Sequence, residues 1–341
     1  MSLMLYQNVY IESLVHVRPE IEIRTQSIET DIAPLYKKLG LKPGWLQAVT
    51  GIRERRFWPA GYKPSDVAVM AAKKALECSA VRREQFGALV SCSVSKDYIE
   101  PSVAAIVHGK LGLPTTAHNY DVGNACLGFL SGMTVIADQI ELGRIDAGIV
   151  VAGESSREPT EATIARLQDP NAGMQEFKDN LATLTLGSAG VAMILTSKRL
   201  SNSGHRLLGG ISRAATQWHG LCVGTATKMT TNPTKLLSEG VALAQRTWAD
   251  VANVLPLTPD TVKEYALHQV GAANHDAILQ ALKIPPTKAI RLYIDNGNVG
   301  ACGVPFSLST LVEKGRVKKG DRVSLMGIGS GLNVMMMGVE W

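Results

Sequence analysis

The sequence predicts a duplicated α/β protein, because apolar strands alternate with amphipathic helices in both halves of the chain. In the first half, strands at 86–94 and 147–151 flank helices at 101–111 and 127–142. The second half repeats the alternation with strands at 265–270, 289–294 and 322–326 and helices at 272–282 and 305–312. Such alternation indicates parallel strands joined by crossover helices.

An equal spacing supports the duplication. A Gly-Arg pair begins at Gly143, after Cys126, and another begins at Gly315, the same distance along the chain after Asn298. Each pair is soon followed by an aspartate and an apolar strand. We therefore expect Cys126 and Asn298 to occupy matching positions in two related halves.

Periodicity and composition assign the remaining segments. In chain order these are a strand at 9–11, a short helix at 33–39, an amphipathic helix at 67–78, a polar helical segment at 159–180 and a strand at 186–195. Residues 51–56 place three arginines after a glycine, which predicts a turn into an exposed basic segment. The polar segment 212–240 predicts a long insertion that caps a substrate channel.

Composition excludes several classes of protein. With 45% apolar and 19% charged residues, the 341-residue chain has a soluble globular composition, as one large domain or two. No apolar run approaches the ~20 residues of a membrane span, and no leader is recognisable, so we expect a cytoplasmic protein. Five scattered cysteines without a Cys-x-x-Cys pair favour free thiols over disulfides or zinc. The dispersed net charge of +5 gives no support for nucleic-acid binding.

Cys126 is the candidate nucleophile. It follows a strand end at 120–122 and a Gly-Asn turn, and it stands where the helix at 127–142 begins. Unpaired amides at a helix N-terminus favour the thiolate by at most about 2 kcal/mol, against ~1.36 kcal/mol per pKa unit. We therefore predict a pKa lowered roughly to neutrality. The alternative is a small buried hydrophobic residue.

Three further groups could join this cysteine. His268 closes an apolar strand, where α/β sheets gather their active sites, although one such histidine is more often structural. Asn298 ends an Asp-Asn-Gly-Asn turn, and residues 327–331 read Gly-Ile-Gly-Ser-Gly without the Lys-Ser/Thr of a P-loop. Together they would supply a nucleophile, its base and hydrogen-bond donors for an oxyanion.

These motifs resemble a known family. The chain resembles the 3-ketoacyl-ACP synthase III branch of the thiolase superfamily. The motifs that carry this resemblance are Asn124-Ala-Cys126-Leu-Gly-Phe129, His268-Gln269 followed by Asn274, Asn296-Gly-Asn298, Gly327-x-Gly-x-Gly331, and Trp45 with Thr50-Gly-Ile-Arg-Glu-Arg55. Within that branch, 96–102 and 327–333 resemble the OleA-type enzymes, which condense acyl-CoAs head to head in olefin biosynthesis. The resemblance spans almost the whole chain.

The resemblance implies a thiolase fold, a five-layer α-β-α-β-α sandwich with halves at 1–200 and 201–341, assembled as a homodimer. Cys126 would accept an acyl group from acyl-CoA as a thioester. His268 and Asn298 would polarise the carbonyl of the second acyl group, and the backbone amides of Cys126 and Ser330 would form the oxyanion hole. Trp45 would bind substrate. No metal or redox cofactor is implied, and downstream enzymes of the same pathway are possible partners.

Glu100 distinguishes two condensations. Joining two unactivated acyl-CoAs to a 2-alkyl-3-ketoacyl-CoA requires removal of an α-proton, whereas a decarboxylative synthase using a malonyl thioester needs no such base. In the OleA-type enzymes the matching glutamate reaches in from the dimer partner. An exposed carboxylate is a poor base at neutral pH, so this role requires burial that raises its pKa. The alternative is an exposed residue ahead of a helix.

Three positions depart from the pattern of the synthase branch. Val49 stands where the synthases have an arginine against the adenine, Ala272 takes a basic position, and Val299 follows the catalytic asparagine. These changes argue against a role in fatty-acid initiation with carrier-protein docking. A third alternative for the function is a non-catalytic partner subunit. Such a subunit would have no chemical need for an intact cysteine, histidine and asparagine.

Overall fold

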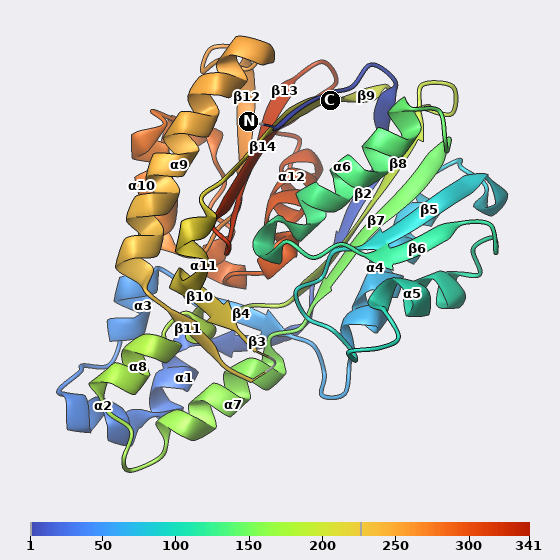
Figure 1. Cartoon of the computed structure of the whole chain (residues 1–341). Coiled ribbons are helices and arrows are strands. Elements are labelled where there is room, and N and C mark those ends of the chain that lie inside the picture. The colour runs from blue at the N-terminus through green and yellow to red at the C-terminus, as the bar shows by residue number, and fades with distance from the viewer. Residues whose placement is uncertain (1, 226) are drawn as a thin grey trace.

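The computed structural model describes residues 2–225 and 227–341 and contains one large mixed sheet (Figure 1). Its strands run in the order β12-β13-β14-β9-β2-β8-β7-β5-β6, with β1 paired to β9. The first half contributes β2 (Val9–Val17), β5 (Phe86–Ser91), β6 (His118–Asp121), β7 (Ala147–Glu154) and β8 (Ala189–Ser197). The other half of the sheet contains β1 (Ser2–Leu5), β9 (His205–Ala214), β12 (Val262–Leu267), β13 (Arg322–Gly329) and β14 (Asn333–Glu340).

Helices cover this sheet in layers. Two of them, α6 (Gly128–Glu141) and α12 (Gly303–Glu313), lie between its two halves. The outer face of the first half packs against α4 (Pro64–Glu77) and α5 (Val103–Leu111), and that of the second against α9 (Pro233–Val254), with α10 (Ala272–Ala281) beside it. The order is therefore helix, sheet, helix, sheet, helix, which confirms the predicted five-layer arrangement.

The two halves of the sheet join through a short ladder. Strand β2 pairs with β8 along most of its length, but it meets β9 only through Tyr10 with Arg206 and Ile11 with His205. The pairs β5–β6, β5–β7 and β12–β13 are parallel, as predicted. The other pairings of this sheet are antiparallel, so the predicted parallel strands form only part of it.

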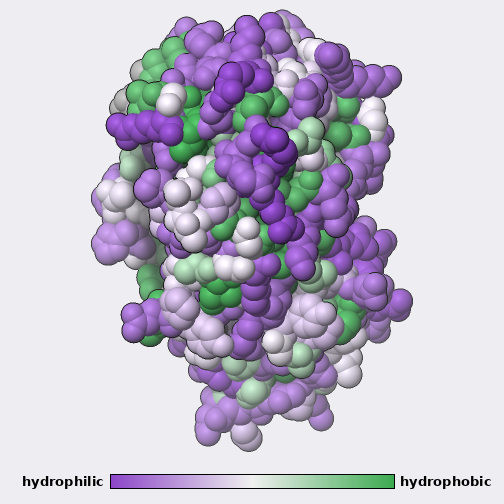
Figure 2. All heavy atoms as spheres, turned by 90° about the vertical axis from the view of Figure 1, so that its right-hand side faces the viewer, coloured by the Kyte–Doolittle hydropathy of each residue, from purple (hydrophilic) through white to green (hydrophobic). Residues whose placement is uncertain are grey.

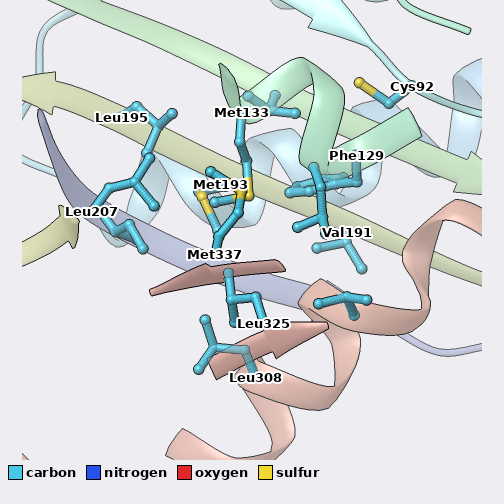
Figure 3. Close-up of a cluster of buried hydrophobic side chains, with 14 of the residues drawn as sticks. Cys92, Phe129, Met133, Val191, Met193, Leu195, Leu207, Leu308, Leu325 and Met337 are labelled. Atoms are coloured by element: carbon cyan, nitrogen blue, oxygen red, sulfur yellow. The ribbon is translucent and has the colours of Figure 1, made fainter. Parts of the chain in front are cut away.

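The main core fills the space between the two halves of the sheet (Figure 3). Phe129 and Met133 project from α6 and Leu308 from α12, and all three are fully buried with Met193 of β8 and Met337 of β14. Each such side chain contributes roughly 1.5–3 kcal/mol by leaving water. This core fixes the starts of α6 and α12 relative to each other, and both starts border the candidate site.

The two central helices end alike but begin differently. Each is followed, one residue after its C-cap, by a glycine in the left-handed region, Gly143 at φ 68° and Gly315 at φ 64°. Short 3-10 turns precede them, η2 (Ala125–Leu127) and η6 (Gly300–Cys302). Because α6 is longer than α12, the two residues differ in their place relative to the 3-10 turns: Cys126 lies inside η2, whereas Asn298 precedes η6. The equal spacing seen in the sequence therefore matches the helix ends rather than the turns.

Smaller elements complete the chain. They are β3 (Ile21–Arg24), α1 (Thr25–Asp31), α2 (Ala33–Leu39), α3 (Trp45–Thr50), β4 (Glu54–Phe57), η1 (Arg83–Gln85), α7 (Arg157–Leu167), α8 (Met174–Asn180), η3 (Thr183–Thr185), η4 (Thr216–Leu221), β10 (Cys222–Gly224), β11 (Met229–Thr231), η5 (Pro286–Lys288) and α11 (Tyr293–Asn296). In Figure 1, α1, α2, α7 and α8 gather at the lower end of the molecule, below the sheet.

Three local predictions differ from the structure, in part or in full. Of the three arginines in the basic segment, only Arg53 is exposed: Arg55 lies on β4 and is fully buried, with its guanidinium bonded to Thr25 Oγ1 at 3.1 Å and Leu184 O at 2.8 Å. Burial lowers the pKa of Arg55 to about 10. Residues 289–294 form no strand and lead into α11. The 212–240 segment includes the end of β9 and the start of the long helix α9, with residue 226 outside the described residues.

The helix expected from residue 101 also begins later. Its first residue is Val103, because Ser102 is the N-cap and its hydroxyl accepts a hydrogen bond from Ala105 N at 3.1 Å. Glu100 therefore lies in the loop that connects β5 to α5, and it is exposed. None of the described helices is both long and apolar enough to cross a bilayer.

Candidate active site

A sharp turn presents Cys126 at the start of α6. The preceding residue, Ala125, has φ 45°, a left-handed conformation that costs about 1–2 kcal/mol for a residue with a Cβ. The turn closes with a hydrogen bond from Leu127 N to Asn124 O at 2.9 Å. Helix α6 then begins at Gly128, where a Cβ would stand 2.4 Å from Cys92 O, so only glycine lets the helix start this close to the end of β5. The strand, turn and helix agree with the prediction.

Cys126 is partly exposed, but the pKa of its thiol is not lowered. The residue differs in this exposure from Cys92 and Cys302, which are buried. Burial of the sulfur and the nearby carboxylate of Glu154 raise the pKa of Cys126 to about 12. The predicted shift toward neutrality is therefore wrong, because desolvation of the thiolate outweighs the helix end. The free protein holds Cys126 as a thiol, so acyl transfer requires a proton acceptor.

The glycine-rich turn packs directly against the cysteine turn. A Cβ on Gly329 would lie 3.2 Å from both Asn124 O and Leu127 N and 3.4 Å from Cys126 N. Behind it, Asn333 donates from Nδ2 to Asn124 Oδ1 at 3.1 Å, which joins the two turns. Ser330 follows Gly329 and is partly buried. The backbone predicted to supply the second oxyanion amide thus lies beside Cys126.

His268 is neutral and oriented by a helix start. It follows β12 directly, and its backbone N–H donates to Met326 O at 2.9 Å. Burial lowers the pKa of His268 to about 4, so the ring is uncharged at neutral pH. Its Nδ1 faces the first residue of α12, since a Cβ on Gly303 would stand 2.9 Å from that atom. The positive end of the helix favours the lone pair on Nδ1, which leaves the proton on Nε2.

The backbone fixes the side-chain amide of Asn298. The residue is 7% exposed, its N–H donates to Thr185 O at 2.8 Å, and its carbonyl accepts from Gly187 N at 2.8 Å. The Oδ1 atom accepts a hydrogen bond from Gly300 N at 3.0 Å. Because a backbone N–H can only donate, the atom that it meets must be the oxygen. The Nδ2 group of Asn298 therefore remains as a donor for a substrate.

Gln269 connects the histidine to the segment before the asparagine. It is 5% exposed, and its Nε2 donates to Ile290 O at 2.8 Å. Its Oε1 accepts from Leu292 N at 2.8 Å and from Tyr293 N at 3.1 Å. Position 269 thus fixes the loop that leads through α11 to Asn298.

The structure brings together the segments of three predicted residues. The Cys126 turn contacts both β13 and η6, η6 follows Asn298, and Gly303 after η6 contacts His268. Glu100 and Trp45 are not part of this cluster in a single chain. Trp45 begins α3 and is partly buried, and its ring lies 5.6 Å from that of Phe177.

Sequence reasoning missed two residues at this site. Glu154 is 4% exposed at the end of β7 and acts on the pKa of Cys126, and Cys222 of β10 acts on it more weakly. A carboxylate that ends the otherwise apolar strand 147–153 is a sequence signal that could have found Glu154. Cys222 carries no comparable signal, because it lies in a polar segment of irregular composition.

Comparison with known proteins agrees with this architecture. Residues 56–206 match the thiolase N-terminal domain family, and residues 254–341 match the C-terminal domain family of 3-oxoacyl-[acyl-carrier-protein] synthase III. The acyl-CoA:acyl-CoA alkyltransferase of Xanthomonas campestris pv. campestris is 40% identical over 338 residues, which cover 99% of this chain and 100% of that protein. The chain belongs to the OleA family of the thiolase superfamily.

Other OleA proteins agree in sequence and in structure. The acyl-CoA:acyl-CoA alkyltransferase of Shewanella oneidensis is 40% identical over 351 residues, covering 99% of this chain and 100% of that protein. The crystal structure of cerulenin-bound Xanthomonas campestris OleA superposes with a TM-score of 0.97 at 40% identity, and the match covers 99% of this chain and 98% of that one.

Variants of Xanthomonas OleA mark three of the predicted positions. Crystal structures exist in which one glutamate, one cysteine or one histidine of that protein is replaced. These three positions follow one another along that chain in the order glutamate, cysteine, histidine. Glu100, Cys126 and His268 have the same order and the same separations in this chain.

Proposed function

We propose that this OleA protein condenses two long-chain acyl-CoAs, without decarboxylation, to a 2-alkyl-3-ketoacyl-CoA. The observation that carries the proposal is the joint occurrence of Cys126, His268 and Glu100 at the spacings of the residues replaced in Xanthomonas OleA. Xanthomonas OleA with its cysteine replaced by serine has been solved with bound lauric acid and lauroyl-CoA, which supports a fatty acyl-CoA as substrate.

The first half-reaction transfers an acyl group to Cys126. The sulfur attacks the thioester carbonyl, the new C–S bond forms, the bond to the CoA sulfur breaks, and the proton of the cysteine passes to the departing CoA thiolate. Because burial lowers the pKa of His268 to about 4, the ring stays neutral and its Nε2–H can only donate, so the proton passes directly to the CoA sulfur as the C–S bond to CoA breaks. The amides of Cys126 and Ser330 stabilise the oxyanion, and one such donor is worth about 3 kcal/mol.

The second half-reaction forms the carbon–carbon bond. Glu100 removes an α-proton from the second acyl-CoA, while His268 Nε2–H and Asn298 Nδ2 donate to the enolate oxygen. The α-carbon attacks the thioester carbonyl on Cys126, the C–S bond breaks, and the proton that Glu100 removed passes to the departing cysteine thiolate, which restores both groups. No bond change requires a metal or a redox cofactor, so we propose that none is used.

This role of Glu100 requires a second copy of the chain. Glu100 is exposed, as are Val94, Tyr98 and Ile99 of the same loop, and Ile99 is 101% exposed. Strand β6 lies beside this loop at one end of the sheet, and the face on that side carries hydrophobic areas among polar ones (Figure 2). We propose a homodimer that covers this loop and buries Glu100 of each subunit near the Cys126 of the other.

The 3-keto thioester product is reactive, so an enzyme that reduces or cleaves the ketone must consume it. We propose a place in olefin biosynthesis with such partners in the cytoplasm.

The test replaces Glu100 by glutamine and supplies two acyl-CoAs without a malonyl donor. We expect acylation of Cys126, seen by intact mass, at the wild-type rate, and a loss of ketone product of about 10²–10⁴-fold. Glu77→Gln, which changes an exposed glutamate at the end of α4, is the control. Unimpaired condensation by Glu100→Gln would remove the base from the mechanism.

One observation favours a second candidate. The beta-ketoacyl-[acyl-carrier-protein] synthase III of Ehrlichia ruminantium is 26% identical over 84% of this chain. A decarboxylative synthase would release carbon dioxide and form product only with a malonyl thioester, so the same assay with and without malonyl-CoA separates the two reactions.

A further inference from the structure

Glu154 is a buried carboxylate that the proposed reaction does not use. It is the last residue of β7 and is 4% exposed. Burial raises its pKa, and four hydrogen bonds from the protein oppose that shift. A carboxylate taken out of water is costly unless its oxygens are satisfied, and each of these four bonds also holds a neighbouring segment of the chain in place.

Three of the four bonds hold the loop after β5. Glu154 Oε1 accepts from Val94 N at 2.8 Å, and Oε2 accepts from Ser95 N at 3.1 Å and Ser95 Oγ at 2.9 Å. Glu100 lies further along this loop. The strand end before Glu154 adds a bond, since Gly153 N donates to Ser93 Oγ at 2.8 Å. The buried carboxylate thus anchors the start of the segment that carries the proposed base.

The fourth bond holds the turn after Asn298. Glu154 Oε1 accepts from Ala301 N at 3.3 Å. Gly300 packs closely against this carboxylate, because a Cβ added at Gly300 would stand 3.1 Å from Glu154 Cδ. Its φ of 56° lies in the left-handed region that favours glycine. The N–H of the same glycine orients the Asn298 amide. One carboxylate therefore contacts both the turn that positions the enolate donor and the loop that carries the base.

We propose that Glu154 is a positioning residue for carbon–carbon bond formation, holding the Glu100 loop of one subunit and the Asn298 turn in a fixed relation. The inference rests on the proposed function, because it assigns Glu100 to the second half-reaction. Through the dimer, Glu154 of one subunit orients the base that acts in the other and the asparagine that acts in its own. It touches no substrate.

The chemistry predicts that the two half-reactions respond differently. Glu154→Gln keeps Oε1 as an acceptor but turns an NH₂ group toward Ser95 N–H, so one backbone donor loses its partner. The loop loosens, and a displacement near 1 Å costs up to about 10²-fold in the step that needs the base. Acylation of Cys126 does not use Glu100. It also loses an unfavourable neighbour, because the charge of Glu154 raises the pKa of the thiol.

The experiment measures both steps in Glu154→Gln. We expect acylation, followed by intact mass in a single turnover, within about twofold of wild type, and condensation with a second acyl-CoA to fall about 10–100-fold with kcat more affected than KM. The matched control is Glu264→Gln. Glu264 is an equally buried carboxylate on β12, and its Oε2 lies 2.8 Å from Nη2 of Arg316. This substitution should lower thermal stability without separating the two steps.

Two further measurements keep the test decisive. Ser95→Ala removes one donor from the loop side and should shift the balance between the steps in the same direction by a smaller factor, even if Glu154→Gln folds poorly. Hydrogen exchange should show faster exchange of residues 93–102 in Glu154→Gln than in Glu264→Gln, whatever the reaction proves to be.

Equal loss of both steps, or unchanged exchange in this loop, would overturn the positioning role. Failure of the proposed function would appear instead in the wild-type protein, which would then form no ketone from two acyl-CoAs.

Discussion

A methyl group added at Gly303 should displace His268 without unfolding the protein. The Cβ of Gly303→Ala would stand 2.9 Å from Nδ1, whereas non-bonded heavy atoms are most stable at about 3.5–4.0 Å. The ring must therefore move by roughly 0.6–1 Å. A displacement of that size costs up to about 10²-fold when it moves a catalytic group.

The expected change in stability is small, because two effects oppose each other. Forcing a methyl group against the ring costs about 1–3 kcal/mol, and replacing a helical glycine by alanine returns up to about 1 kcal/mol. We therefore expect condensation to fall about 10–100-fold while the free energy of unfolding decreases by about 0–3 kcal/mol. Product formation by mass spectrometry and urea unfolding measure the two quantities.

Gly109 provides the matched control. It lies in α5 with no atom within 4 Å of the position where a Cβ would be placed. Gly109→Ala should raise the free energy of unfolding by about 0.5–1 kcal/mol and leave catalysis unchanged. Full activity in Gly303→Ala would refute the reasoning, since it would show that the position of the His268 ring does not limit either half-reaction.

Two predictions concern pH. Because the pKa of Cys126 is raised to about 12, iodoacetamide should modify Cys126 more slowly than the exposed Cys78 at pH 8. The rate of modification, measured by peptide mapping, should rise about tenfold per pH unit up to pH 10. A rate that reaches a plateau near neutral pH would instead show that Cys126 is a thiolate. Burial lowers the pKa of His275 to about 4 in the folded chain, while the unfolded chain protonates it near 6.5, so its contribution to stability is complete above pH 6.5 and is lost as the pH falls toward 4. Urea titrations between pH 4 and 8 should show a shallower decline for His275→Phe than for wild type, and equal slopes would exclude this assignment.

Local sequence patterns predicted the elements that carry the site. Helices at 33–39 and 272–282 appear as α2 and α10, and the cysteine and the histidine lie at the helix start and the strand end where they were expected. These predictions succeeded because strand ends and helix starts have short-range signals. Asn298 instead follows the short helix α11, which includes the first two residues of the turn predicted at 295–298. The prediction of a strand at 289–294 failed because a short apolar run is also compatible with an irregular segment, which here is hydrogen-bonded to Gln269.

Tertiary burial explains what the sequence could not reveal. Arg55 resembles a surface residue in a basic run, yet the fold encloses it with Thr25 and the carbonyl of Leu184. The pKa of Cys126 depends on how much water reaches the sulfur and on Glu154, which belongs to the next strand, β7, beyond the whole of α6. The direction of that shift is decided by contacts between distant segments, and a helix start alone did not predict it.

The pairing of β1 with β9 affects how the chain is made. Strand β1 is synthesised before every other strand of this sheet, but its partner residues, such as Ile211 opposite Leu3, follow only after β2 and β5 to β8 have been made. During that time the exposed apolar side chains of β1 have no ladder to join. Contacts between residues so far apart in sequence form slowly, because the long intervening loop must be closed first. The sheet can be completed only after β14 has been synthesised, so folding of this protein should be slow.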